Sequence, residues 1–179
     1  RKPIERVADA DEPRLVVVVE RQDVEAIRGG LETAQRLVVV GAGYIGLEVA
    51  SVAVKYGLEV HVLEMEERIL QRVTTPEMSA YYHQLHTGRG VHIHTSTMVS
   101  GFSGDGHVTA VECGDQSFPA DLVIVGIGII PNTEVAEAAG IECDNGIVVD
   151  DHCRTSDPYV YAAGDCTNHP NPLLDRRLR

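Results

Sequence analysis

One segment, residues 36–64, constrains the fold of this 179-residue chain more than any other. It begins with an uninterrupted aliphatic run at residues 37–40, which is followed at once by the glycine-rich stretch GAGYIG at 41–46. A helix is expected over residues 44–56 and a second aliphatic strand over 59–63. Continuous Val and Leu runs of this kind are typical of parallel strands that are buried on both faces. The segment therefore predicts a βαβ unit of a parallel sheet.

The glycines follow the G-x-G-x-x-G spacing of a phosphate-binding turn. In such a turn Gly41 permits the sharp bend, Gly43 leaves room for a pyrophosphate, and Gly46 lets the helix approach the strand. Glu64 ends the second strand, about 20 residues after the glycines, where a carboxylate binds ribose hydroxyls and repels a 2′-phosphate. These residues predict a Rossmann-type site for NAD(H) rather than NADP(H). A structural glycine turn beside an incidental acid is the alternative.

Composition limits the partners of the chain. The net charge of −12 argues against nucleic acid and against an anionic membrane surface. The apolar stretch at 37–54 contains Glu48 and three glycines of the motif, so it is not interpreted as a membrane span. The four cysteines show no C-x-x-C spacing, which favours reduced thiols and a cytoplasmic location.

Other segments predict a mixed architecture. Side chains alternate in character with a period of two residues on either side of Gly104 and Gly106, which predicts an antiparallel meander over residues 98–118. Asp23 is expected to cap a short helix at 24–28 that stops at Gly29. The remaining expected elements are a linker at 1–14, strands at 15–19, 91–94, 122–125, 146–149 and 159–163, and helices at 75–87 and 133–139. The predicted fold class is α/β, a Rossmann-like doubly wound parallel sheet with an antiparallel β-meander.

Three segments, in this order, carry a family resemblance: GAGYIGLEVA at 41–50, GIGIIPN at 126–132 and TSDPYVYAAGD at 155–165. Together they resemble the FAD-dependent pyridine nucleotide-disulfide oxidoreductase superfamily. Residues 169–179 are most similar to its ferredoxin, putidaredoxin and rubredoxin reductase branch. In that family an NAD domain interrupts the sequence of an FAD domain.

The resemblance implies an NAD(P)-binding domain over residues 15–128 and the returning segment of an incomplete FAD-binding domain over 129–179. The function it implies is that of an NADH-dependent flavoprotein, using NAD(H) and FAD, that passes electrons to a ferredoxin- or rubredoxin-type carrier. This fragment alone would be inactive. Two alternatives stay open: an NADH:disulfide oxidoreductase or NADH oxidase of the same superfamily, and a stand-alone NAD-binding module without catalysis.

The resemblance also implies roles for single residues. Tyr44 and Glu48 lie four apart on one helix face, so Glu48 would orient the nicotinamide carboxamide and Tyr44 would line or gate the stacking site. Simple solvation or packing of these two side chains is the alternative. Gly128 would let the chain pass close to the nicotinamide, and Asp165 would accept a hydrogen bond from the FAD ribityl chain. The full cofactor-binding set is Gly41, Gly43, Tyr44, Ile45, Gly46, Glu48, Glu64, Gly126, Gly128, Gly164 and Asp165.

Two further patterns of the sequence have the chemistry of binding sites. His83 and His86, and His92 with His94, have spacings that suit zinc, but no acid or cysteine completes a familiar ligand set. They are interpreted as solvated histidines, and no metal is expected. The arginines within 176–179 form a basic cluster that would either help dock an acidic ferredoxin or lie solvated at the surface.

Overall fold

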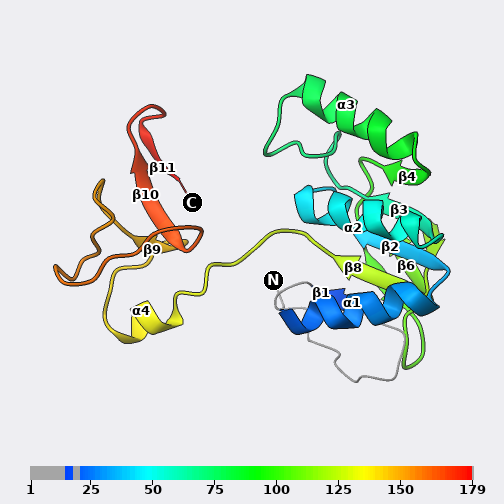
Figure 1. The fold of residues 1–179 in the computed structure, drawn as a ribbon, viewed down its shortest axis with the longest axis horizontal. Coiled ribbons are helices and arrows are strands. Elements are labelled where there is room, and N and C mark those ends of the chain that lie inside the picture. The colour runs from blue at the N-terminus through cyan, green and yellow to red at the C-terminus, as the bar shows by residue number, and fades with distance from the viewer. Residues whose placement is uncertain (1–14, 18–20, 179) are drawn as a thin grey trace. The chain divides into compact units, whose positions relative to one another are not determined.

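The computed structural model describes residues 15–17 and 21–178, in two compact units divided between Gly128 and Ile129. The linker predicted at residues 1–14 lies outside the described residues. The elements of the first unit, shown in Figure 1, are β1 (Leu15–Val17), α1 (Arg21–Thr33), β2 (Arg36–Val40), α2 (Tyr44–Lys55), β3 (Glu59–Leu63), α3 (Pro76–Thr87), β4 (Val91–His94), β5 (Gly101–Ser103), β6 (Ala110–Cys113), β7 (Gln116–Pro119) and β8 (Leu122–Val125).

A five-stranded parallel sheet in the order β1-β8-β2-β3-β4 forms the centre of this unit. In β2, Leu37 and Val39 point to one face while Val38 and Val40 point to the other, and all four are buried. Side chains on both faces are therefore removed from water, which is why the strand reads as an uninterrupted aliphatic run.

Different layers cover the two faces of the sheet. Residues of α1 and α2, with Tyr82 of α3, pack against Leu37, Val39 and their neighbours. The antiparallel sheet β5-β6-β7 covers the opposite face through Val111 and Phe118. The predicted parallel α/β sheet with an antiparallel meander is confirmed. The meander occupies the face that a second helical layer covers in other doubly wound sheets.

Helix α1 corrects one prediction. It begins at Arg21 and continues to Thr33, so Asp23 lies inside it and Gly29 does not end it. The cause is packing on the sheet: a Cβ on Gly30 would lie 3.1 Å from both methyl carbons of Leu122. Close packing of the helix there, together with burial of its Ile27, outweighs the helix propensity that glycine costs, about 1 kcal/mol per residue.

The other helix ends agree with their sequence signals. Gly57 follows α2 with a φ of +85°, the left-handed conformation expected after a helix end. Thr75 is the N-cap of α3, Pro76 is its first residue, and Glu77 lies in its first turn. In the described residues no helix is long and apolar enough to cross a membrane.

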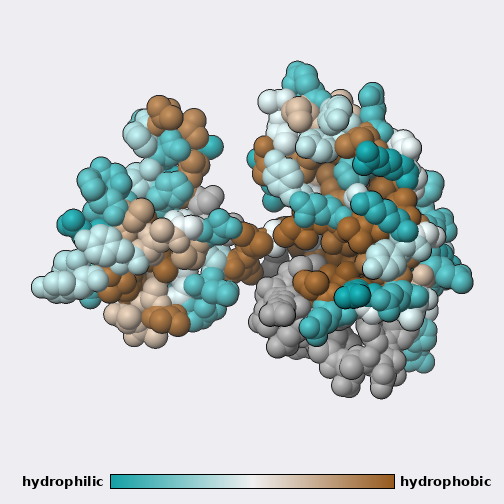
Figure 2. Space-filling view, in the orientation of Figure 1, coloured by the Kyte–Doolittle hydropathy of each residue, from teal (hydrophilic) through white to brown (hydrophobic). Residues whose placement is uncertain are grey.

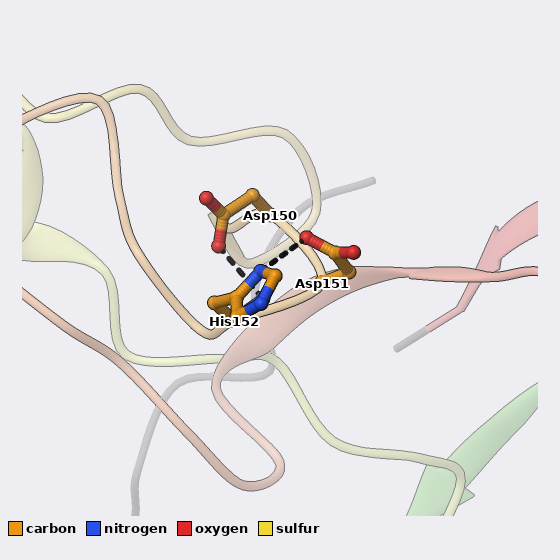
Figure 3. A group of neighbouring side chains, drawn as sticks. All are labelled: Asp150, Asp151 and His152. Atoms are coloured by element: carbon orange, nitrogen blue, oxygen red, sulfur yellow. Dashed lines mark hydrogen bonds and ion pairs between the residues drawn. The ribbon is translucent and has the colours of Figure 1, made fainter.

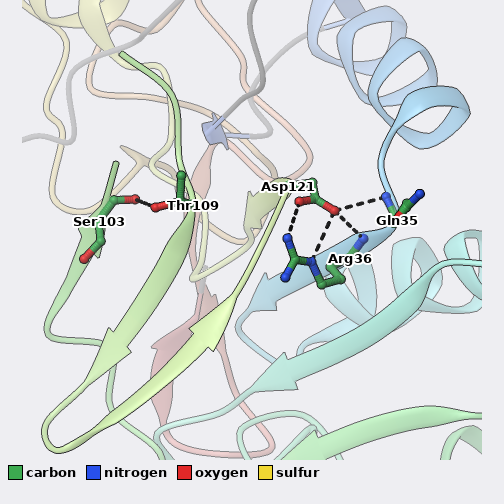
Figure 4. A network of polar contacts seen from close by, with 5 residues as sticks. All are labelled: Gln35, Arg36, Ser103, Thr109 and Asp121. Carbon is green, nitrogen blue, oxygen red and sulfur yellow. Dashed lines mark hydrogen bonds and ion pairs between the residues drawn. The ribbon is translucent and has the colours of Figure 1, made fainter. Parts of the chain in front are cut away.

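Arg36 and Asp121 join two neighbouring strands of the parallel sheet (Figure 4). Nη2 of Arg36 lies 2.7 Å from Oδ1 of Asp121, and the backbone N–H of Arg36 donates to Oδ2 at 2.9 Å. The N–H of Gln35 donates to the same oxygen at 3.2 Å. Across the meander, the hydroxyl of Thr109 donates to the carbonyl of Ser103 at 3.2 Å. The contacts of Asp121 lie at the amino ends of β2 and β8, whereas the glycine turn follows the carboxyl end of β2.

The second unit contains α4 (Glu134–Ala138), β9 (Ile147–Val148), β10 (Thr167–Asn171) and β11 (Arg176–Leu178). Strand β10 pairs in parallel with β9 and antiparallel with β11. The helix at 133–139 is confirmed, and the strand expected at 146–149 is reduced to two residues.

The strand predicted at 159–163 is wrong. Only an isolated bridge, between Arg154 and Tyr161, occurs there among the described residues. Side chains bind the backbone groups that a strand would have paired: Asp157 accepts from the N–H of Tyr159 at 2.8 Å, and the hydroxyl of Thr155 donates to the carbonyl of Val160 at 2.9 Å. Local side-chain hydrogen bonds of this type compete with sheet formation.

Candidate functional site

The carboxyl ends of β2 and β8 lie side by side, with Val40 opposite Val125 in the register. The residue after β8, Gly126, donates its N–H to the carbonyl of Val40 at 2.8 Å. Strand β3 lies on the other side of β2, so the glycine turn leaves the sheet where the strand order changes direction. Open parallel sheets bind ligands at such a position.

Close backbone approaches require glycine at two positions of the turn. Gly41 has a φ of +100°, and a Cβ on it would lie 2.5 Å from the carbonyl oxygen of Gly126. A Cβ on Gly46 would collide with the carbonyl oxygen of Gly41 and lie 3.2 Å from Cγ1 of Val39. These glycines are explained by packing of the turn, whatever it binds.

Gly43 differs from them because the space beside it is open. Apart from chain neighbours, no described residue has a heavy atom within 4 Å of a Cβ built there. Gly43 is the N-cap of α2, and Leu47 is the first residue whose N–H reaches back, to the Gly43 carbonyl at 3.1 Å. The N–H groups of Tyr44, Ile45 and Gly46 therefore form the electropositive end of the helix. This geometry fits a pyrophosphate.

Glu64 is held against the glycine turn. Its Oε2 accepts a hydrogen bond of 2.7 Å from the N–H of Ala42, and its Oε1 accepts one of 3.0 Å from the N–H of Glu66. A carboxylate has about four acceptor positions, so about two remain for ribose hydroxyls. The observed arrangement fits the adenosine ribose of NAD(H).

Two members of this arrangement were not found from the sequence. Ala42 occupies a variable position of the G-x-G-x-x-G pattern, and it acts through its backbone N–H, which no side-chain pattern reveals. Glu66 follows Glu64 by two residues, and this short separation is the one sequence signal that the two residues could be in contact. Leu70 also donates its N–H to the carbonyl of Ala42 at 3.0 Å, so the loop after β3 closes on the turn.

The residues assigned to the nicotinamide end are accessible. Tyr44 is 52% exposed and Ile45 is 46% exposed at the start of α2, and Glu48 is exposed one turn later. Gly128, which ends the first unit, is exposed with a φ of +131°. The structure thus leaves these groups free of core packing, and their contact with nicotinamide stays a prediction. Hydrophobic residues gather on the face of this unit around α2 (Figure 2).

Gly164 and Asp165 lie in the second unit, at an open depression of about 420 Å³. Gly164 has a φ of +94°, and its carbonyl accepts hydrogen bonds from both the N–H and the hydroxyl of Thr167. Asp165 is exposed, so its carboxylate is accessible to a hydroxyl donor. Their contact with the FAD ribityl chain stays a prediction.

Asp150 and Asp151, which line the same depression, form with His152 a group with metal-ligand chemistry (Figure 3). All three are exposed. Nδ1 of His152 lies 2.6 Å from Oδ1 of Asp151, and Asp150 accepts from the N–H groups of His152 and Arg154. The carboxylate of Asp150 thus stabilises the turn at residues 150–154 by accepting backbone hydrogen bonds, and no metal is assigned to the group.

The histidines form a cluster that the sequence did not predict. Nδ1 of His61 lies 3.0 Å from Nε2 of His94, and the ring of His92 stacks on His61 with centroids 4.9 Å apart. His94 is partly buried beside Phe118, so the expectation that it is solvated is wrong, whereas His92 is exposed. Burial first, and the neighbouring His61 and His92 second, lower the pKa of His94.

One arginine of the basic cluster at residues 176–179 makes hydrogen bonds within the second unit. Arg177 donates from Nε to Oδ1 of Asn168 at 2.7 Å and from Nη2 to the carbonyls of Asn168 and Val149. Its guanidinium therefore stabilises the second unit. Arg176 is exposed, and Arg179 lies outside the described residues.

The profile of the family described as pyridine nucleotide-disulphide oxidoreductase matches residues 6–176. The chain belongs to this family. As a member it shares the Rossmann-like architecture described above, and the predicted family resemblance is confirmed.

Two curated proteins of the family are similar to this chain. It is 51% identical to putidaredoxin reductase CamA of Pseudomonas putida over 162 residues, which are 88% of this chain and 38% of that protein. It is 44% identical to the ferredoxin–NAD(+) reductase component of the anthranilate 1,2-dioxygenase system of Burkholderia cepacia, over 88% of this chain and 39% of that protein.

Among solved structures, the covalent putidaredoxin reductase–putidaredoxin complex matches with a TM-score of 0.87 and 45% identity, over 98% of this chain and 44% of the matched chain. The family member described here therefore spans about two fifths of the length of the curated relatives it matches. The close agreement in fold therefore applies to the matched 44% of that chain.

Proposed function

We propose that this chain is the NADH-binding part of an FAD-dependent reductase that passes electrons from NADH to a ferredoxin- or rubredoxin-type carrier. The observation that carries the proposal is the Glu64 carboxylate, held 2.7 Å from the N–H of Ala42, beside the open N-terminus of α2. The family membership and the names of its relatives as reductases support it.

In this proposal the first unit binds and orients the dinucleotide. The N–H groups of Tyr44, Ile45 and Gly46 bind the pyrophosphate, and Glu64 binds the adenosine ribose and repels a 2′-phosphate. On the exposed face of α2, Glu48 orients the nicotinamide carboxamide and Tyr44 lines its stacking site. Bound NADH supplies a hydride, for which FAD is the acceptor in such reductases.

Other residues take supporting roles. Gly126 and Gly128 keep the chain after β8 close to the dinucleotide, and Gly164 with Asp165 supplies a contact to the FAD ribityl chain. Residues 15–128 are then the NAD(P)-binding domain and 129–179 a returning segment of an FAD-binding domain. A cytoplasmic location belongs to the same proposal and is supported by the scattered free cysteines.

Calorimetry on the 179-residue chain tests the binding half of the proposal. NADH should bind with a one-to-one stoichiometry and NADPH much more weakly, and the purified chain should show no flavin absorbance. Equal affinity for the two nucleotides would contradict the assignment of Glu64. For the catalytic half, a full-length protein containing this segment should reduce a ferredoxin or rubredoxin with NADH. A protein that holds FAD but reduces neither carrier would contradict it.

A further inference from the structure

The loop between β3 and α3 contains two arginines, Arg68 and Arg72, close to the carboxylate that would read the ribose. A guanidinium at this position is the group that accommodates the 2′-phosphate of NADP(H) in dinucleotide-binding folds. The two arginines of the loop are therefore expected to weaken a preference for NADH. The structure shows how both guanidinium groups are occupied.

Arg68 is bound by its own loop and by α3. Its Nη1 donates to the hydroxyl of Ser79 at 2.6 Å and to the carbonyl of Thr74 at 3.0 Å, and its Nη2 donates to the carbonyl of Gln71 at 3.0 Å. Ser79 is buried, and its hydroxyl donates a hydrogen bond to the carbonyl of Ile69 at 2.7 Å. Arg68 thus holds the loop against α3 and has a structural role.

Arg72 is bound by Glu66. Nη2 of Arg72 lies 3.2 Å from Oε1 of Glu66, while Nε2 of Gln71 donates to the other carboxylate oxygen at 3.0 Å. The Glu66 side chain is only 29% exposed, against 70% for Arg72. The carbonyl of Glu66 also accepts from the N–H of Ser96 at 2.8 Å, so both its backbone and its side chain are fixed.

Glu66 is also adjacent to Glu64, because its N–H donates to Oε1 of Glu64 at 3.0 Å. The backbone of Glu66 therefore contacts the carboxylate that, in the proposed function, receives the adenosine ribose, and the Glu66 side chain adds a second negative charge to the same loop. From these contacts we infer that Glu66 is a second specificity residue for NADH. It adds negative charge beside Glu64, and it holds Arg72 away from a 2′-phosphate.

This inference rests on the proposed function, in which Glu64 receives the adenosine ribose. Substituting Glu66 removes one repelling charge and frees one guanidinium at the same time. The substitution Glu66→Gln keeps the side-chain volume and one acceptor oxygen for Gln71, so the loop is preserved. The released Arg72, which is mostly exposed, then gains a charge-assisted hydrogen bond to the 2′-phosphate.

The test measures dissociation constants of NADH and NADPH by calorimetry on the 179-residue chain and its variants. Glu66→Gln should raise the affinity for NADPH relative to NADH by about tenfold, the size of one hydrogen bond to a charged group. The double variant E66Q/R72Q should lose most of that gain. Arg72→Gln alone should leave the ratio nearly unchanged, because Glu66 already withholds the guanidinium. Glu67→Gln is the matched control, since Glu67 is the next acid along the loop and is exposed.

The outcomes separate this inference from the proposed function. Wild-type protein that binds neither nucleotide overturns both. Wild-type protein that prefers NADH, with an E66Q ratio equal to that of E67Q, overturns the inference and leaves the function intact. A gain in E66Q that persists in the double variant overturns the role of Arg72. Thermal unfolding of each variant in the absence of nucleotide verifies that the ratios are measured on folded protein.

Discussion

The backbone N–H of Ala42 donates a hydrogen bond of 2.7 Å to Oε2 of Glu64. This contact joins the turn after β2 to the end of β3 without any ligand. The acid that would read the ribose is consequently held in place beforehand, and binding need not pay to order its side chain. In the same way Leu70 donates to the Ala42 carbonyl at 3.0 Å and closes the loop on the turn.

Glu64→Gln should separate nucleotide recognition from folding. The amide oxygen can still accept from Ala42, but the negative charge and one of the two acceptor oxygens are lost. We expect the affinity for NADH to fall about tenfold while that for NADPH does not fall, as measured by calorimetry. Glu25→Gln, an exposed acid on α1, is the control and should leave both affinities unchanged. An equal loss for both nucleotides would argue that Glu64 is only structural.

Substituting Gly43 should weaken nucleotide binding, whereas substituting Gly46 should lower the stability of the fold. The space beside Gly43 is open, so Gly43→Ala should unfold at the wild-type temperature yet bind NADH at least about tenfold more weakly, because the methyl group meets the pyrophosphate. Gly46→Ala should instead destabilise the fold by about 1–3 kcal/mol, since its Cβ meets the Gly41 carbonyl and Val39.

Calorimetry and thermal unfolding of these glycine variants provide the two measurements. Gly101→Ala is the control: apart from its chain neighbours, no described residue has a heavy atom within 4 Å of a Cβ at this position, and its φ is not in the left-handed region. It should change neither quantity. A Gly43→Ala variant that binds NADH normally would place the pyrophosphate elsewhere.

Asp121 should make the stability of the chain depend on pH in the acidic range. Hydrogen bonds from Arg36 are the main cause that lowers the pKa of Asp121 below its ordinary value of 3.8. The unfolded chain therefore binds the proton more readily, so the stabilisation is complete above the unfolded pKa and is lost as the pH falls through the folded one. Asp121→Asn should cost about 1 kcal/mol near pH 7 and flatten this acid dependence.

Denaturant unfolding between neutral pH and about pH 3 measures the effect of Asp121. The control is Asp105→Asn, an exposed acid in the β5–β6 connection. It should keep both the neutral stability and the acid slope of the wild type. A slope that survives in Asp121→Asn would assign the acid dependence to other carboxylates.

His94 should add a second pH dependence near neutrality. Its pKa is lowered from 6.5, chiefly by burial and then by His61 and His92, so the unfolded chain takes up the proton first as the pH falls. Stability should decline as the pH drops from above 6.5 toward the lower folded pKa. His94→Gln should reduce this decline in denaturant titrations at several pH values, whereas the exposed His107→Gln should not. An unchanged decline in His94→Gln would assign it to another group.

Short-range signals predicted much of the fold correctly. The aliphatic run of β2, Gly57 after α2 and Pro76 at the start of α3 each act within a few residues of where they stand, so the sequence shows them directly. The glycine turn and the position of Glu64 after β3 could be predicted for the same reason, because both depend on short-range spacing. The errors at α1 and at residues 159–163 arose where a distant contact, Gly30 on Leu122, or local side-chain bonds outweighed propensity.

The sequence by itself therefore determined the βαβ unit, the glycine turn and the position of Glu64 directly after β3. Only the tertiary structure decided how that acid is held, because the Ala42 N–H acts through the backbone and comes from a different strand end. The pairing of Arg72 with Glu66 was likewise decided by the path of the loop after β3. Backbone donors and side-chain partners across a loop depend on three-dimensional proximity, which no spacing rule encodes.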